Sequence, residues 1–277
     1  LGFTTLNNGP SHYGLSLILG GAECTLWELC SAYFYLAKKL NNQPIRKLEY
    51  LANVNNEKEI NINQFSKASI FQIFEILTQV NRPMEQGAWK IFDSSREIAW
   101  KTGTSFGQRD AWSVGVTPEY VVGVWVGNAD GEGRPGLTGV KMAAPLMFDV
   151  FDKLPKTSWF SAPYEEFKAI EVCAKSGYRK SMLCPESKFI NVSQMGVHFP
   201  TCSFHKKIHL DKQEKYRVTS KCYNVSEMKE KIWFTLPPLQ GWYYRYNHPD
   251  YKKLPDIHPL CVEENERIMD LIYPNAG

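Results

Sequence analysis

The residues best suited to chemistry in this chain are Lys101, Thr102, Gly103 and Thr104, which follow a short apolar run and precede Ser105. Side chains alternate between the two faces of a strand, so on a strand both threonine hydroxyls point to one side. A lysine there supplies a fixed positive charge that can hold a substrate carboxylate, and a glycine lets another backbone or a nucleophile come close. The Thr104 N–H could be one donor of an oxyanion hole. We therefore expect an exposed sheet margin where Lys101 to Thr104 are catalytic, Ser105 helps to bind substrate, and an extended peptide is gripped in a groove.

The segments after this motif predict a β-hairpin. DAWSVGV and YVVGVWVG read as its two arms, and residues 117–119 read as its turn. The second arm is almost entirely apolar, which predicts a central strand covered on both faces.

Three helices, and one further segment that is a helix or a loop, are expected around this hairpin. TLWELCSAYFYLAKKL has helical apolar spacing, and Thr25 and Glu28 form a capping-box signature at its start. AAPLMFDVFDKL, residues 143–154, gives another helix, and HYGLSLILGGAE gives a buried helix or loop. Helices on both sides of a small antiparallel sheet define an α+β core. The helix expected in KASIFQIFEILTQV has one apolar face, made of Ile70, Ile73, Phe74 and Leu77.

The composition changes after Pro155, where Cys, Pro, Tyr and Lys become frequent and no clear period or internal repeat is visible. We interpret this part as a loop-rich connector stapled by disulfides in an oxidising compartment; the alternative is a set of unpaired thiols in a reducing one. Cys24 and Cys30 are expected to be buried, free and hydrophobic in character. Nearest-neighbour pairing of the connector cysteines, Cys173–Cys184 and Cys202–Cys222, is favoured and leaves Cys261 single.

The connector also holds a set of residues with metal-binding side chains, Cys202, His205, His209 and Cys222. Their spacing fits no common zinc finger, and a disulfide would compete for the same cysteines. We therefore expect no metal and no cofactor.

Aromatic side chains gather in the same part of the chain. We expect them to pack a small core that lacks aliphatic residues, and the alternative is a surface on which sugars stack. They are Trp242, Tyr243, Tyr244, Tyr246 and Tyr251.

Charge and hydropathy exclude two classes of partner. The net charge is only +3 and the basic residues are scattered, so we expect no nucleic-acid binding. No apolar stretch approaches the roughly 20 residues that span a bilayer.

This chain resembles the penicillin-binding transpeptidases at their third active-site motif and the hairpin that follows it. The resemblance lies in the run KTGTSFGQRDAWSVGVTPEYVVGVWVGNADG. YGLSLILGGAECTLWELCSAY and RPGLTGVKMAAPLMFDVF resemble the class A subgroup called penicillin-binding protein 1C. The resemblance implies a partial penicillin-binding transpeptidase fold, related to serine β-lactamases, over residues 1–155. It further implies a connector over residues 156–268 and the start of an Ig-like domain at 269–277.

The activity that this resemblance implies is acyl transfer by a serine to peptidoglycan stem peptides, with β-lactams as mimics of the substrate. The family needs Ser-x-x-Lys, Ser-x-Asn and Lys-Thr-Gly in that order, and only the last is in place. Two Ser-x-x-Lys strings, at 203–206 and 226–229, follow Lys101 and are expected to be coincidental. We therefore expect a fragment that is inactive alone, whose partner is the missing N-terminal part, anchored in the membrane and facing the periplasm.

Two other functions stay open at this point. One is a non-catalytic module that binds or scaffolds the cell wall. The other is a cysteine-rich structural connector in which Lys-Thr-Gly occurs by chance.

Overall fold

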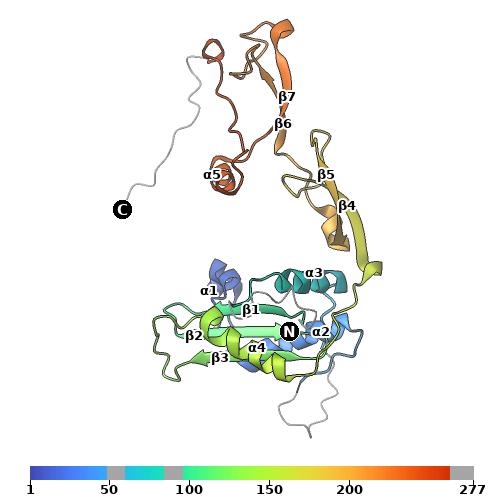
Figure 1. Cartoon of the computed structure of the whole chain (residues 1–277), viewed down its shortest axis with the longest axis vertical. Coiled ribbons are helices and arrows are strands. Elements are labelled where there is room, and N and C mark those ends of the chain that lie inside the picture. The colour runs from blue at the N-terminus through green and yellow to red at the C-terminus, as the bar shows by residue number, and fades with distance from the viewer. Residues whose placement is uncertain (49–59, 84–95, 263–277) are drawn as a thin grey trace. The chain divides into compact units, whose positions relative to one another are not determined.

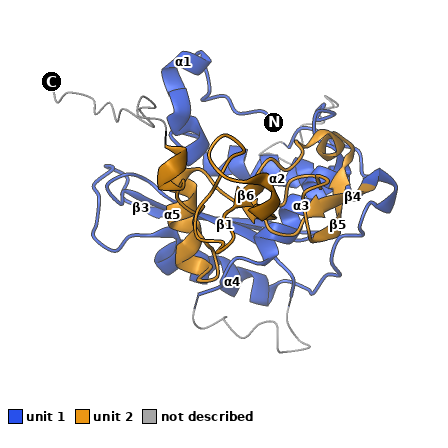
Figure 2. Ribbon diagram, turned by 90° about the horizontal axis from the view of Figure 1, so that it is seen from above, with its two compact units in different colours: residues 1–167 blue, residues 168–277 orange. Residues whose placement is uncertain are grey.

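The computed structural model describes residues 1–48, 60–83 and 96–262, which form two compact units, Leu1–Phe167 and Lys168–Gly277 (Figures 1 and 2). The expected Ig-like start at 269–277 lies outside the described residues. The main helices and strands are, in chain order, α1 Pro10–Tyr13, α2 Leu26–Leu40, α3 Lys67–Thr78, β1 Ala99–Thr104, β2 Asp110–Val116, β3 Val121–Gly127, α4 Ala144–Lys153, β4 Phe167–Cys173, β5 Ser187–Ser193, β6 His205–Leu210, β7 Lys229–Phe234 and α5 Pro238–Asn247.

The first unit is built on a three-stranded antiparallel sheet in the order β1-β2-β3 (Figure 1). The predicted hairpin is confirmed, and its turn closes through a hydrogen bond from Thr117 N to Tyr120 O of 2.9 Å. The α+β class is confirmed as well, because helices pack on both faces of this sheet.

The prediction that β3 is the central strand is wrong for the part of the chain that the structure describes, because β2 holds that place. Both faces of β3 are nevertheless covered. A Cβ at Gly123 would lie 2.2 Å from Cys30 Sγ of α2, and Val122 and Val124 pack against the cluster formed with α4. The apolar sequence of β3 therefore reflects its two helical covers rather than strands on both edges.

The helix α2 begins as its sequence predicts. Thr25 accepts a hydrogen bond from Glu28 N of 3.1 Å, and the Glu28 carboxylate accepts one from Thr25 N of 3.0 Å. This reciprocal capping box satisfies backbone donors that the first turn leaves unpaired.

The apolar face of α3 differs from the predicted one. Ile70 and Phe74 are buried as expected, but Phe71 is buried while Ile73 is 53% exposed. Phe71 packs edge-on against Phe167, with ring centroids 6.1 Å apart. The helix is therefore turned toward the chain that leaves the first unit, which a helical period alone does not reveal.

The segment at 10–21 is not buried. It forms α1 and a short 3-10 helix, Gly14–Leu19, in which no residue is buried. Its apolar side chains face outward, and Leu15, Ile18 and Leu19 are each more than four-fifths exposed.

The third predicted helix is confirmed as α4, which follows a π-helical turn, Gly139–Ala143. It buries Phe148 and Phe151 against the sheet. Phe148 meets the fully buried Trp100 of β1 edge-on, at 5.2 Å between ring centroids. The buried half of β1 therefore anchors the strand whose other half is exposed.

The second unit is more regular than its sequence suggests. It contains two two-stranded sheets, β4-β5 and the antiparallel β6-β7, and the helix α5. The aromatic residues of this part divide into two groups. Tyr244 and Tyr251 pack around Phe234, whereas Trp242 and Tyr246 on α5 are more than half exposed. Among the described residues, no helix has the length and apolarity that a bilayer crossing requires.

Candidate functional site

The residues from Lys101 to Thr104 lie on β1 at the margin of the sheet, because β1 pairs only with β2 among the described strands. Ala99 and Trp100 are buried, but Lys101, Gly103 and Thr104 are exposed and Thr102 is half-buried. The strand therefore passes from the core to the surface within its own length, with its free edge accessible over the motif.

The two threonines share one face of β1, as the alternation of side chains predicts. Thr104 Oγ1 accepts a hydrogen bond of 3.0 Å from Gly139 N, in the turn before α4. A Cβ at Gly139 would lie 2.5 Å from Gly103 O and 2.8 Å from the Cβ of Thr102. Only a glycine fits this contact, so the turn at Gly139 holds both threonines in place.

The ammonium group of Lys101 is not gathered with these hydroxyls. Lys101 and Gly103 belong to the opposite face of the strand, and Lys101 Nζ donates to Thr102 O at 2.5 Å. Another strand or helix could still approach Gly103 on that face, where the nearest atom to an added Cβ is Trp112 Cβ at 3.6 Å.

Ser105 has a role in the turn that follows the strand. Its hydroxyl accepts a hydrogen bond of 2.8 Å from Asp110 N, and its own N–H donates to Asp110 O at 3.0 Å. These bonds close the loop between β1 and β2, where Gln108 has a φ of 54°. The geometry therefore gives Ser105 a structural task that the sequence did not indicate.

Neither Ser-x-x-Lys string lies on an α-helix. Ser203 precedes β6 and Lys206 is on that strand, while Ser226 sits in a 3-10 turn and Lys229 begins β7. A serine and a lysine three residues apart share a face on a helix, but they lie on opposite faces of a strand.

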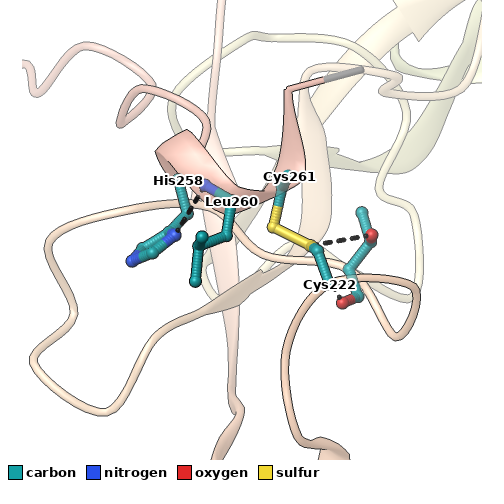
Figure 3. Close-up of a disulfide and its surroundings, with 5 residues drawn as sticks. Cys222, His258, Leu260 and Cys261 are labelled. Atoms are coloured by element: carbon teal, nitrogen blue, oxygen red, sulfur yellow. Dashed lines mark hydrogen bonds between the residues drawn. A yellow bond between two sulfur atoms is a disulfide. The ribbon is translucent and has the colours of Figure 1, made fainter. Parts of the chain in front are cut away.

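The disulfide of the second unit differs from the predicted pairs. Cys222 is bonded to Cys261, whereas Cys173, Cys184 and Cys202 are free (Figure 3). The prediction from nearest neighbours failed because the chain returns from α5 and brings Cys261 beside Cys222.

The three free cysteines form a buried cluster with His205. Their sulfur atoms and a ring nitrogen of His205 all lie within 4.8 Å of one another, and all four residues are at most 6% exposed. Of the four metal-binding side chains singled out in the sequence, Cys202 and His205 belong to this cluster, whereas Cys222 is in the disulfide. His209 instead lies 3.8 Å from Glu230 on β7.

Hydrogen bonds around Cys202 favour the ionised form of its thiol. Burial opposes ionisation, but hydrogen bonds from Ser176, His205 and the backbone lower the pKa of the Cys202 thiol to about 6. In the first unit, burial instead raises the pKa of the Cys30 thiol to about 11. Cys24 and Cys30 are free as predicted, but both are only partly buried.

Comparison with known proteins agrees with the resemblance predicted from the sequence. No protein-family model matches the chain. Penicillin-binding protein 1C of Escherichia coli (strain K12) is 35% identical over 150 residues, which are 52% of this chain and 18% of that protein. The structure of penicillin-binding protein 1A from Haemophilus influenzae covers 71% of the chain and 36% of its own, at 17% identity and a TM-score of 0.44.

About half of the chain is thus similar in sequence to a penicillin-binding protein. The relative is penicillin-binding protein 1C, which confirms the predicted resemblance. The chain spans less than a fifth of that relative's length.

Proposed function

We propose that this chain is part of a peptidoglycan D,D-transpeptidase and carries its third active-site motif at Lys101, Thr102, Gly103 and Thr104. The observation that carries the proposal is the position of this motif on an accessible edge strand. The similarity of half the chain to penicillin-binding protein 1C supports it.

In this proposal the free edge of β1 pairs with the end of a stem peptide. The positive charge of Lys101 and the hydroxyls of Thr102 and Thr104 would hold the terminal carboxylate. Thr104 Oγ1 accepts from Gly139, so its own proton stays available for donation to that carboxylate. Because Lys101 lies on the other face of the strand, its ammonium group would reach the carboxylate around the edge of the strand or act on it through a neighbouring group.

The covalent steps would use a serine supplied by another part of the same protein. Its oxygen forms an ester with the penultimate D-alanine carbonyl carbon, the amide bond breaks, and the terminal D-alanine leaves with the proton. An amine from a second stem peptide then displaces the serine and forms the cross-link. A β-lactam ring would acylate the same serine.

A second feature supports a longer protein. The side chains of Leu15, Ile18 and Leu19 form an exposed apolar surface that an isolated unit would rarely keep. We propose that the missing N-terminal part covers this surface and brings the nucleophile. The protein would then work outside the cytoplasm, where peptidoglycan is assembled, with an anchor in that missing part.

The test is acylation by labelled penicillin, read by intact mass. The isolated chain is expected to gain no adduct, because neither of its Ser-x-x-Lys strings lies on an α-helix. The full-length protein is expected to gain one adduct. An adduct on the isolated chain would overturn the proposal that it lacks the nucleophile.

The alternative function is a non-catalytic module that binds cell-wall glycan. It is favoured by the exposed Trp242 of α5, which lines a cavity of about 420 Å³ together with Arg245 and Tyr251. This alternative predicts that the full-length protein is not acylated, while the chain sediments with purified peptidoglycan and Trp242→Ala abolishes that binding.

A further inference from the structure

The second unit contains a repeated backbone motif. An antiparallel bridge joins Val172 to Arg179, and the same bridge joins Leu210 to Arg217, 38 residues further along (172 to 210, 179 to 217). In both copies the arginine is also bridged, in parallel, to a later segment. The two copies are hereafter the first repeat and the second repeat.

The hydrogen bonds of the two repeats match position by position. Cys173 N donates to Tyr178 O at 2.8 Å, and Asp211 N donates to Tyr216 O at 3.0 Å. After the next strand, the return segment is fixed in the same manner. The corresponding bonds there are Cys202 N to Arg179 O at 2.8 Å and His258 N to Arg217 O at 2.9 Å.

These matches define four equivalent positions in each repeat. In the first repeat they are the members of the buried cluster. The pairs of equivalent residues are Cys173 and Asp211, Cys184 and Cys222, Cys202 and His258, and His205 and Cys261.

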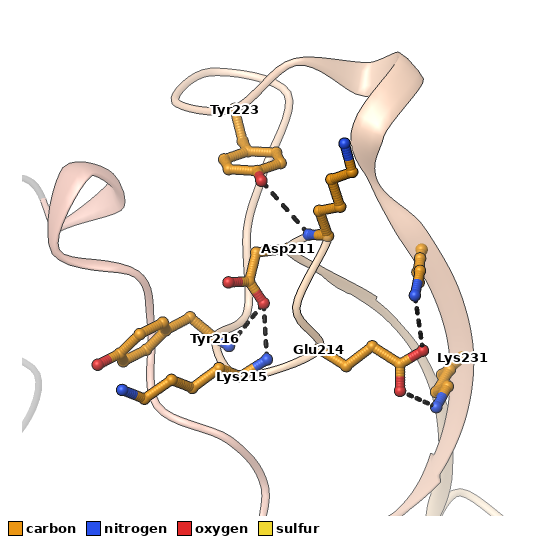
Figure 4. A network of polar contacts seen from close by, with 8 residues as sticks. Asp211, Glu214, Lys215, Tyr216, Tyr223 and Lys231 are labelled. Carbon is orange, nitrogen blue, oxygen red and sulfur yellow. Dashed lines mark hydrogen bonds and ion pairs between the residues drawn. The ribbon is translucent and has the colours of Figure 1, made fainter.

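The second repeat uses two of these positions for a covalent link, since Cys222 and Cys261 form the disulfide (Figure 3). Its first position is Asp211, whose carboxylate accepts hydrogen bonds from Lys215 N and Tyr216 N at 2.7 and 3.0 Å (Figure 4). In the second repeat the turn and the return segment are therefore tied together by a disulfide and backbone hydrogen bonds.

The first repeat cannot form the equivalent disulfide, because His205 stands where Cys261 would be. Its four positions instead hold three thiols and one imidazole, all types that bind zinc. His205 Nδ1 lies 3.5 Å from both Cys173 Sγ and Cys202 Sγ. Two ligands of a tetrahedral zinc with ordinary Zn–S and Zn–N bonds are roughly 3.6 Å apart, so this spacing needs little adjustment.

The surroundings of the sulfur atoms also suit thiolates. Ser176 N donates to Cys173 Sγ at 3.4 Å, and Ser181 N donates to Cys184 Sγ at 3.3 Å. Donors of this kind stabilise and orient thiolate ligands. Phe204 and Tyr178 pack against the sulfurs and keep water away.

We propose that the first repeat binds one zinc ion through Cys173, Cys184, Cys202 and His205. With four protein ligands the site is closed, so its task is structural: it fastens the first repeat as the disulfide fastens the second. Each sulfur binds Zn²⁺ as a thiolate, so the thiol protons still present on the cluster are released when the ion binds. The proposal does not depend on the transpeptidase function.

The test is the metal content of the chain purified without chelator, measured by mass spectrometry of the elements. The expected value is about one zinc per chain, and Cys184→Ser or His205→Ala should remove most of it. Cys24→Ser is the matched control, a free cysteine outside the cluster, and should keep the metal. Zinc-free wild-type protein would overturn the proposal.

A second measurement covers variants that fail to fold. Wild-type chain loaded with Co²⁺ should show the thiolate-to-cobalt charge-transfer absorption of a site with several sulfur ligands. Alkylation after denaturation in chelator, without reductant, should label all three cluster cysteines. A disulfide between any two of them, or a cobalt spectrum without that absorption, would refute the zinc site.

Discussion

The position of the Lys101–Thr104 motif at the margin of the sheet depends on close contacts with Gly139. Gly139 touches Gly103 O and Trp112 O so closely that a Cβ would lie 2.5 Å from each. Its N–H donates to Thr104 Oγ1. One residue without a side chain thus supports the strand and orients a hydroxyl of the proposed site.

Gly139→Ala should destabilise the first unit by about 1–3 kcal/mol, because the added methyl group meets backbone that cannot move freely. Urea unfolding of the chain, followed by tryptophan fluorescence, measures this. Gly9→Ala is the control, since nothing lies within 4 Å of a Cβ there. Equal stability of the two variants would show that the turn yields easily.

The residue types from Lys101 to Thr104 predicted an exposed edge strand, and the structure has this strand there. The task of Ser105 could not, because its partner Asp110 is met only when the strands pair. Nor could the cluster around His205 be predicted, since Cys173 and Cys184 approach it only through the folded turns.

At the scale of elements, the start of α2 is stabilised by one carboxylate. Glu28 Oε1 accepts from Thr4 N and Thr4 Oγ1 at 2.7 and 2.6 Å, and Oε2 accepts from Thr25 N. Hydrogen bonds from the Thr4 side chain, then from the Thr25 and Thr4 backbone, lower the pKa of Glu28 from its usual 4.5 to about 2.

A carboxylate with a lowered pKa stabilises the fold above its unfolded pKa and loses this effect as the pH falls through the folded one. The contribution of Glu28 should therefore be complete above about pH 4.5 and disappear toward pH 2. Glu28→Gln should lower the melting temperature at pH 7 and leave it closer to wild type at pH 2.5. If the difference in melting temperature between the two proteins were the same at pH 7 and pH 2.5, this role of Glu28 would be contradicted.

Elements differ in how far their sequence predicts them. The capping box and the hairpin follow from local residues and are confirmed. The wrong face of α3 has a tertiary cause, since Phe71 contacts Phe167 nearly a hundred positions away. The sequence did not reveal the repeat because its two copies share few residues. They have in common little more than a Tyr-Arg pair, at 178–179 and 216–217, and a cysteine five positions after the arginine.

At the scale of the molecule, the two units have separate cores and are stabilised by different interactions. The first unit is held by aromatic and aliphatic packing on both faces of its sheet. The second has a smaller core, with a cysteine cluster and the disulfide Cys222–Cys261. Small cores commonly depend on such cross-links.

Replacing Cys222 and Cys261 together by serine should therefore lower the stability of the second unit alone. A disulfide that spans 39 residues contributes roughly 4 kcal/mol by the loop-entropy relation. Differential scanning calorimetry should show one transition moved and the other unchanged. A common shift of the whole profile would mean that the units unfold together.

The most direct measurement of the central claim is the rate constant for acylation of the full-length protein by a fluorescent penicillin. If Lys101 holds the substrate carboxylate, Lys101→Ala should lower this constant by about 10²–10³-fold. Lys153→Ala, an exposed lysine on α4, should change it less than about twofold. Acylation of the Lys101→Ala protein at the wild-type rate would contradict the assignment of this edge strand as the peptide-binding margin.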